Sequence, residues 1–198
     1  MSDTPLHILA VVGSLHEKSV TRVAVNHVAG LLRADGCTVD VLDLHAEPLP
    51  LLNTDTTFTA DYYAPLRARV LAADAFLLGA PDYHGSISSP LKNFLDHFWH
   101  EFAGRLFATL VASHEKGLTV HDQLRTVARQ CQAWALPYGV SFLEKVDVKE
   151  GAVATDEMRK KLVLLARDVR VYGGLLAQQR KADLAGSDNC FLARLRKK

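Results

Sequence analysis

Cysteine is scarce in this sequence, and the few cysteines present form no recognisable framework. Cys37, Cys131 and Cys190 are odd in number and widely spaced, without a CxxC pair or a Cys/His spacing typical of a metal site. This scarcity argues against a disulfide-stapled domain and favours a reducing compartment. Because the N-terminus also lacks the charged and apolar regions of a cleavable leader, we expect a cytoplasmic protein, and we expect no metal site.

Long apolar runs and an excess of charge of one sign are also missing. No run approaches the ~20 apolar residues that span a bilayer, and 23 basic residues against 22 acidic ones leave a net charge of +1. This balance predicts neither a nucleic-acid nor a membrane partner. The one basic cluster lies near the C-terminus, so we expect a single domain at 1–180 followed by a frayed basic tail at 181–198.

The sequence does contain a regular alternation of strand and helix patterns. Near-continuous apolar runs that end at glycine or proline suit strands buried on both faces of a sheet, and stretches with apolar residues at helical spacing separate them. The predicted strands are 7–12, 38–44, 75–80, 106–112 and 138–142, with 146–148 as an extension or a separate short strand, and the predicted helices are 19–34, 63–73, 89–100, 119–135 and 156–178. This alternation predicts an α/β fold, a flavodoxin-like doubly wound five-stranded parallel sheet in the order 2-1-3-4-5 with helices on both faces.

In such a sheet, ligands bind beyond the carboxyl ends of the strands, where the strand order reverses. The loop after the first strand offers hydroxyl groups at Ser14, Ser19 and Thr21 and positive charge at His16 and Lys18, and a helix N-terminus follows it. These features suit an anion. The alternative is an ordinary turn in which Ser19 caps the helix. The loop contains neither GxxxxGK[ST] nor GxGxxG, so neither a P-loop nor a dinucleotide-binding Rossmann site is supported.

The loop after the third strand carries groups that suit a flat heteroaromatic ring. Pro81 stiffens the exit from the strand, Tyr83 and His84 supply planar side chains, and Gly85 permits close approach of the backbone. A flat ring needs apolar or aromatic contact and a few backbone N–H donors. This loop can supply both.

The motifs in these two loops resemble those of the NADPH-dependent FMN reductase family, a branch of the flavodoxin-like superfamily. The family's first signature, GS-x-R-x-x-S-x-[NT], is matched at Gly13, Ser14, Ser19 and Thr21. Its second signature, P-[EQD]-Y-[NH]-[GW]-[SG] followed by LKN-x-[LI]-D, is matched at Pro81, Asp82, Tyr83, His84, Gly85, Ser86, Leu91, Lys92, Asn93, Leu95 and Asp96. The resemblance covers roughly residues 6–145.

This resemblance implies an FMN-binding protein. The implied contacts are Ser14, His16, Ser19, Val20 and Thr21 for the phosphate, and Pro81, Asp82, Tyr83, His84, Gly85, Ser86, Ser113, His114, Lys116 and Gly117 for the ring. It also implies hydride transfer from NADPH or NADH to flavin N5 and then to a small-molecule acceptor such as free flavin or a quinone, in a homodimer or homotetramer. No catalytic residue is expected, because the flavin carries the chemistry. The alternatives are a non-enzymatic electron carrier of the flavodoxin type and a flavin-binding redox sensor.

Two departures from the family pattern bear on the site. His16 stands where relatives usually have a phosphate-binding arginine, and a neutral imidazole brings less charge, so we expect weaker or pH-sensitive FMN binding. A third loop, at 113–117 after the predicted strand at 106–112, has Gly117 as its one glycine, whereas relatives usually carry more. Our hypothesis is that Lys116 or His114 in this loop stabilises negative charge near the N1/O2 edge of the reduced flavin.

Overall fold

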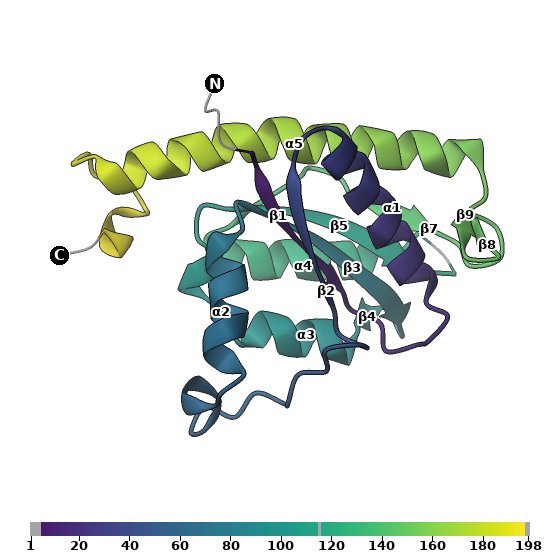
Figure 1. The fold of residues 1–198 in the computed structure, drawn as a ribbon, viewed down its shortest axis with the longest axis horizontal. Coiled ribbons are helices and arrows are strands. Elements are labelled where there is room, and N and C mark those ends of the chain that lie inside the picture. Colours follow the sequence, from purple (N-terminus) through teal and green to yellow (C-terminus); the bar gives the residue numbers. More distant parts are fainter. Residues whose placement is uncertain (1–4, 115, 197–198) are drawn as a thin grey trace.

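The computed structural model describes residues 5–114 and 116–196 of the chain. Its centre is a sheet in the order β2-β1-β3-β5-β6, and neighbouring strands along this path run parallel (Figure 1). The principal strands are β1 (His7–Val12), β2 (Thr38–Asp43), β3 (Ala75–Tyr83) and β5 (Leu106–Ala112). The predicted doubly wound α/β class is confirmed.

Helices cover both faces of the sheet (Figure 1), with α1 and α5 on one face and α2, α3 and α4 on the other. Their bounds are α1 (Val20–Ala34), α2 (Tyr63–Ala72), α3 (Ser89–Asp96), α4 (Leu118–Gln130) and α5 (Asp156–Ala185).

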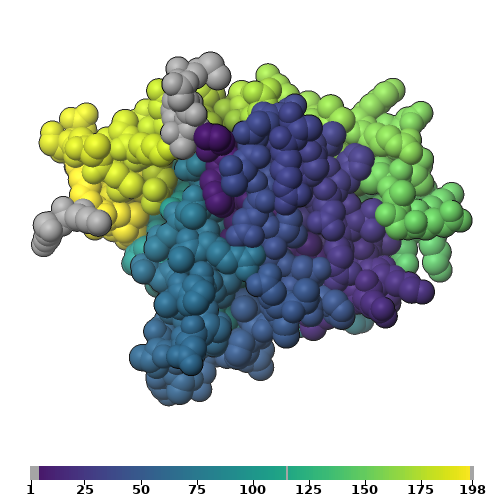
Figure 2. Space-filling model, in the orientation of Figure 1, coloured from purple at the N-terminus to yellow at the C-terminus, as the bar shows by residue number. Residues whose placement is uncertain are grey.

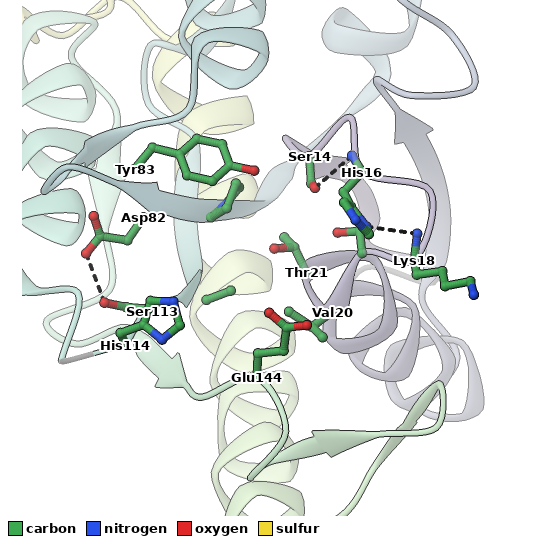
Figure 3. Close-up of a pocket in the computed structure, with 13 residues that line it drawn as sticks. Ser14, His16, Lys18, Val20, Thr21, Asp82, Tyr83, Ser113, His114 and Glu144 are labelled. Carbon is green, nitrogen blue, oxygen red and sulfur yellow. Dashed lines mark hydrogen bonds between the residues drawn. The ribbon is translucent and has the colours of Figure 1, made fainter.

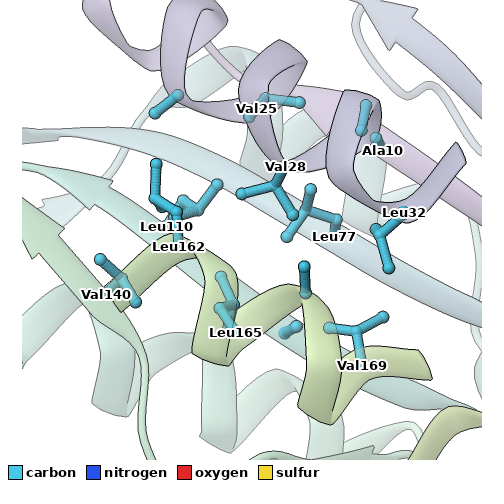
Figure 4. Packing of buried hydrophobic residues seen from close by; sticks show 14 of the residues in the cluster. Ala10, Val25, Val28, Leu32, Leu77, Leu110, Val140, Leu162, Leu165 and Val169 are labelled. Atoms are coloured by element: carbon cyan, nitrogen blue, oxygen red, sulfur yellow. The ribbon is translucent and has the colours of Figure 1, made fainter. Parts of the chain in front are cut away.

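The residues of β1 explain why both faces need a helical cover. Alternate side chains of a strand point to opposite faces of the sheet. Ile8 and Ala10 therefore pack with α1 and α5, in the cluster drawn in Figure 4, whereas Leu9 and Val11 pack on the side of α2, α3 and α4. All four side chains are fully buried. This burial on two sides accounts for the near-continuous apolar run in the sequence.

The strand order differs in one detail from the predicted 2-1-3-4-5, because the fifth strand is divided into β6 (Trp134–Ala135) and β7 (Val140–Phe142). Both pieces pair in parallel with β5. Pro137 lies between them and has no N–H to donate to a ladder. Upstream, Gln132 has a left-handed φ of 56°, and the helix predicted at 119–135 stops at Gln130.

Two other predicted boundaries are wrong for local reasons. β3 continues through Pro81 to Tyr83 and then turns back into the short antiparallel strand β4 (Ser86–Ile87). The helix predicted at 89–100 ends at Asp96, and the turn η2 (His100–Phe102) follows. The His97 ring Nδ1 lies 2.7 Å from the Asn93 carbonyl, while the His97 backbone N–H bonds Phe94 O, so the last turn tightens to 3₁₀ geometry.

The segment after α5 is folded, in contrast to the predicted frayed tail. α5 runs to Ala185 instead of ending at 178, and the chain then folds back through the turn η3 (Ala193–Leu195). Arg196 Nε donates to the Asp183 carbonyl at 2.8 Å. Figure 2 shows this C-terminal segment, in yellow, packed against the body of the molecule. The predicted tail is therefore ordered as far as residue 196, and Lys197 and Lys198 lie outside the described residues.

The other connections contain short elements. The connection at 45–62 includes the turn η1 (Thr57–Thr59). After β7 the chain forms a small hairpin of β8 (Val148–Lys149) and β9 (Ala152–Val153), so the predicted strand near 146–148 is separate from the main sheet. None of the described helices is both long and apolar enough to cross a membrane. Over the same residues, no group of three His, Cys, Asp or Glu side chains is placed to hold a metal ion.

Candidate functional site

Three loops, at the carboxyl ends of β1, β3 and β5, meet around one pocket (Figure 3). The pocket is lined by Ser14, His16, Lys18, Ser19, Val20, Thr21, Pro81, Asp82, Tyr83, Ala112, Ser113, His114 and Glu144. A second hollow adjoins it at Asp82, Ser113 and His114 and is further lined by His84, Gly85, Lys116, Gly117, Leu118 and Thr119. Every predicted site residue except Ser86 lines one of these two hollows, so residues far apart in the sequence converge on one edge of the sheet.

The first loop is fixed to the sheet where it begins. The Gly13 N–H donates to Gly79 O at 2.8 Å, and the buried Ser88 hydroxyl donates to Gly13 O at 2.6 Å. A β-carbon at Gly13 would lie 2.7 Å from Gly79 O and 2.6 Å from Leu91 Cβ, so a side chain does not fit there. The close approach sets the first loop directly beside the end of β3.

The hydroxyl groups of the first loop are buried at the start of α1. Ser14, Ser19 and Thr21 are 3 %, 5 % and 1 % exposed. Ser19 is the helix N-cap, and its Oγ accepts the Arg22 N–H at 3.2 Å. The first N–H groups of a helix have no partner within it, and its dipole makes this end positive. The capping turn and the anion site are therefore compatible interpretations of the same residues.

Arg22 holds the shape of the first loop, a role that our sequence analysis missed. Its Nη1 donates to the carbonyls of His16 at 3.0 Å and Glu17 at 2.7 Å. Its Nε and Nη2 both pair with the carboxylate of Asp43, at the end of β2. The pairing of Arg22 with Asp43 could have been suspected from the parallel register of β1 and β2, which sets Asp43 opposite Val12 and beside the start of α1. Since Arg22 is engaged with Asp43, its charge is already neutralised within the protein.

The pairing with Arg22 affects the pKa of the Asp43 carboxyl group. Burial raises the pKa of Asp43, but the hydrogen bonds from Arg22 and from the His45 N–H outweigh burial, and its pKa falls below the ordinary value. Asp43 therefore stays ionised and keeps Arg22 in place well into the acidic range.

Two hydrogen bonds hold His16 in place and select the tautomer of its neutral ring. The His16 N–H donates to Ser14 Oγ at 3.3 Å, and the His16 Nδ1 accepts the Lys18 N–H at 3.0 Å. Nδ1 has no proton when it accepts this bond, so the proton of the neutral ring lies on Nε2. The neutral ring of His16 thus offers one N–H donor, and the Lys18 side chain extends away from the other pocket residues (Figure 3).

The second loop is a tight hairpin turn. Asp82 pairs with Ile87 and Tyr83 with Ser86, which leaves His84 and Gly85 as the two turn residues. Their φ angles are +56° and +71°, the combination that a two-residue hairpin turn of type I′ requires. The turn leaves Tyr83 54 % exposed at the mouth of the pocket.

Asp82 and Gln123 fix this turn from two sides. Asp82 accepts the Gly85 N–H at 2.8 Å and the Ser113 hydroxyl at 2.9 Å, and so connects the second loop to the third. Gln123 of α4 accepts from the Ile87 N–H at 3.0 Å and from the Ser86 hydroxyl at 3.1 Å, and donates to Gly85 O at 3.2 Å. Ser86, predicted as a ring contact, therefore points to α4. The role of Gln123 was missed in the sequence because its contact with Ser86 spans more than thirty residues.

The third loop has its glycine where the backbone needs one. Gly117 is the N-cap of α4 with a left-handed φ of 60°, and a β-carbon there would lie 2.7 Å from Val111 Cγ1. His114 and Lys116 are both exposed along the second hollow.

Glu144 is a third residue, after Arg22 and Gln123, that our sequence analysis missed. It follows β7, and its carboxylate points into the pocket opposite the first loop (Figure 3). Its place at the carboxyl end of the divided fifth strand was the available signal, because that end of the sheet was already expected to hold the ligand.

Comparison with known proteins agrees with this arrangement. The sequence profile of the NADPH-dependent FMN reductase family matches residues 6–147. A probable NADPH:quinone oxidoreductase 1 from rice, Oryza sativa subsp. japonica, is 37% identical over 97 residues, which are 46% of this chain and 48% of that protein. An FMN-dependent NADPH-azoreductase from Staphylococcus haemolyticus is 37% identical over 94 residues, or 45% of this chain and 50% of that protein. The chain thus spans about half the length of the curated relatives it matches.

A solved structure supports the fold over a longer stretch. FerB, a flavoenzyme NAD(P)H:(acceptor) oxidoreductase from Paracoccus denitrificans, superposes with a TM-score of 0.69 at 18% identity, covering 88% of this chain and 98% of that one. At this identity the likeness concerns the fold alone. Because the family profile spans most of the chain and includes the first two loops of the pocket, the chain belongs to the NADPH-dependent FMN reductase family.

Proposed function

We propose that the chain binds FMN in the pocket formed by the three loops and acts as an NAD(P)H-dependent oxidoreductase. The observation that carries this proposal is the convergence of both family signatures and the third loop on one pocket at the carboxyl edge of the sheet. A doubly wound sheet binds its ligand at this edge.

The donor set of the first loop fits the phosphate of FMN. Ser14, Ser19 and Thr21 bring buried hydroxyl groups, and the start of α1 brings N–H donors. Arg22 is paired with Asp43, so the cation of this loop that is left for the phosphate is Lys18, whose side chain must turn toward the pocket to reach it, and His16 adds an Nε2–H donor. This set carries less charge than an arginine-bearing loop, which supports the expectation of weaker FMN binding than in relatives.

The second and third loops fit the flavin ring. The turn at His84 and Gly85 presents its backbone to the second hollow, and a β-carbon at Gly85 would meet only Thr119 Oγ1, at 3.6 Å. Tyr83 adds an exposed aromatic face beside it. We keep His114 and Lys116 as candidates for the polar edge of the ring, because both are exposed along this hollow.

When bound, FMN supplies the redox chemistry, taking a hydride from NADPH or NADH and passing the electrons to a small-molecule acceptor. The chain's own part is to hold the phosphate, orient the ring and leave the Tyr83 side open to both substrates. The relatives from rice and Staphylococcus haemolyticus are named for quinone and azo substrates. We propose acceptors of the same flat, conjugated kind.

We further propose that the protein works in the cytoplasm as a homodimer or homotetramer. The free state of Cys37, Cys131 and Cys190 supports a reducing compartment. Trp99, which is 60 % exposed, and Leu118, which is 64 % exposed, are candidate contacts in such an assembly. Light scattering during size-exclusion chromatography measures the assembly directly.

The test is a visible absorption spectrum of the purified protein, followed by anaerobic addition of NADPH. We expect flavin absorption that bleaches. The variant Ser14→Ala/Thr21→Ala should lose FMN, while the control Thr59→Ala, a surface hydroxyl on η1, should keep it. Bound flavin that does not bleach would favour the electron carrier or redox sensor. A protein that refuses added FMN would overturn the proposal.

A further inference from the structure

One buried histidine outside both hollows is joined to the second hollow by a chain of hydrogen bonds. His121 on α4 is 5 % exposed. Its Nδ1 lies 2.8 Å from Thr109 Oγ1 on β5, and its Nε2 lies 3.0 Å from Ser141 Oγ on β7. Both ring nitrogens of a buried imidazole are therefore used, and they bridge two neighbouring strands.

The donor and the acceptor of each hydrogen bond in this chain can be assigned. Ser141 Oγ also contacts the Lys116 carbonyl closely, and a carbonyl can only accept, so the Ser141 hydroxyl donates to it. Ser141 then accepts from His121 Nε2–H, and His121 Nδ1 accepts from the Thr109 hydroxyl. This is the neutral ring. Burial lowers the pKa of His121, and the nearby Arg125 lowers it further, whereas Asp122 opposes the shift without reversing it.

The position of the imidazole ring is fixed by shape as well as by hydrogen bonds. A β-carbon at Gly139 would lie 2.3 Å from both His121 Cε1 and Nδ1, and 2.4 Å from Thr109 Oγ1. Only a residue without a side chain fits between β6 and β7 at this point. The backbone of Gly139 therefore packs directly on the ring and leaves it no room to turn.

The far end of the chain of hydrogen bonds is the third loop. The Ser113 N–H donates to Phe142 O at 3.0 Å and its hydroxyl donates to Asp82, so the start of the loop is fixed independently of His121. At the end of the loop, the Lys116 carbonyl accepts from the Ser141 hydroxyl, and this is the side-chain bond through which His121 reaches the loop. The same helix holds the second loop through Gln123.

We propose that His121 is a positioning residue for the flavin: through Ser141 it holds the third loop in the shape that receives the ring. The proposal rests on the proposed function, since it presumes that the ring lies against this loop. It assigns no proton transfer and no substrate contact to His121.

The competing explanation is that His121 only stabilises the fold, and the chain contains a matched control. His97 is another buried histidine, 2 % exposed, whose two ring nitrogens lie 2.7 Å from Asn93 O and 3.0 Å from Tyr62 Oη. It belongs to the end of α3 and lines neither hollow. A purely structural role predicts the same consequences for the loss of either histidine.

The experiment compares His121→Phe, Ser141→Ala, Ser141→Thr and His97→Phe with the wild type. FMN dissociation constants come from quenching of flavin fluorescence, and backbone amide exchange at 113–117 is measured on the protein without FMN. We expect roughly five- to tenfold weaker FMN binding for His121→Phe and Ser141→Ala, the equivalent of about one hydrogen bond, together with faster exchange of the loop. Ser141→Thr keeps a hydroxyl and should retain the FMN affinity and the loop exchange rate of the wild type. His97→Phe should lower stability while leaving FMN affinity and loop exchange unchanged.

The outcomes separate the two proposals. A wild type that refuses FMN contradicts the proposed function, and the exchange data then still decide whether the network holds the loop. A wild type that binds FMN beside a Ser141→Ala variant with unchanged affinity and exchange overturns the role of His121 alone. If His121→Phe unfolds, the pair Ser141→Ala and Ser141→Thr carries the test, because Ser141 is only partly buried.

Discussion

Replacing Arg22 with methionine tests how the first loop keeps its shape. Methionine preserves most of the side chain's apolar length but removes the hydrogen bonds to Asp43 and to the carbonyls of His16 and Glu17. The loop then loses its connection to the end of β2. We expect both lower stability and weaker FMN binding, because the phosphate donors no longer have a fixed arrangement.

The structure sets the size of the effect. The side chains of Arg22 and Asp43 are each 19% exposed, so the pair is mostly shielded from water. Hydrogen bonds to charged groups contribute about 1.5–3 kcal/mol each, but bonds that share one group do not add. We therefore expect Arg22→Met to lower the free energy of unfolding by about 2–3 kcal/mol. In a double-mutant cycle with Asp43→Asn, we expect a coupling energy of about 1–2 kcal/mol.

Urea denaturation of the protein without FMN measures these stabilities. Lys161→Met is the control, since its ion pair with Glu157 is exposed and exposed pairs contribute about 0–1 kcal/mol. The pKa of Asp43 is lowered in the folded state, so its contribution is present above the unfolded pKa and is lost as pH falls through the folded pKa, below about pH 4. Asp43→Asn should therefore make the free energy of unfolding less dependent on pH in this acidic range. A coupling energy near zero, together with the same loss of stability at low pH in Asp43→Asn as in the wild type, would refute the reasoning.

Three further changes have defined outcomes. Gly85→Val places a β-branched residue at a φ of +71° and should abolish FMN binding in absorption titrations, whereas Gly174→Ala, in open space on α5, should not. His16→Arg should tighten FMN binding by roughly tenfold and make it more sensitive to salt, as fluorescence titration at two ionic strengths would reveal; unchanged affinity would mean that His16 does not face the phosphate. Arg105 is buried, its pKa is lowered by burial to about 10, and it donates to the carbonyls of Val70, Leu71 and Glu101. Arg105→Met should therefore cost about 3 kcal/mol in urea denaturation, since it strands buried carbonyls, and FMN affinity should not change.

The main strands and the location of the pocket were predictable from the sequence for a physical reason. A strand buried on both faces must be apolar along its length, as at 7–12, and a parallel sheet puts every strand's exit at the same edge. Motifs after β1 and β3 therefore had to meet. The boundaries that failed depend on single residues, such as the left-handed Gln132 and the ring of His97 that accompanies the early end of α3.

The supporting contacts of the site were not predictable in the same way. Arg22 reaches Asp43, 21 positions away, Gln123 reaches Gly85, 38 positions away, and His121 reaches Thr109, 12 positions away. Such hydrogen bonds leave no periodic pattern in a sequence. The parallel register of β1 and β2 brings Asp43 near α1, but nothing in the residue order says which side chain it pairs with. Local patterns describe elements well and describe the contacts between elements poorly.

The two edges of the sheet bear on how the protein avoids aggregation. β2 forms one edge and the divided strand, β6 and β7, forms the other, and an edge strand offers unpaired backbone groups to other chains. β2 carries Asp40, which forms an ion pair with Arg69, and charged side chains on an edge strand discourage a second strand from docking. β6 is accompanied by the folded-back C-terminus, where Phe191 packs edge-on against Trp134. The C-terminal segment thus lies beside one open edge of the sheet, and we expect its removal to make β6 more accessible to a neighbouring molecule.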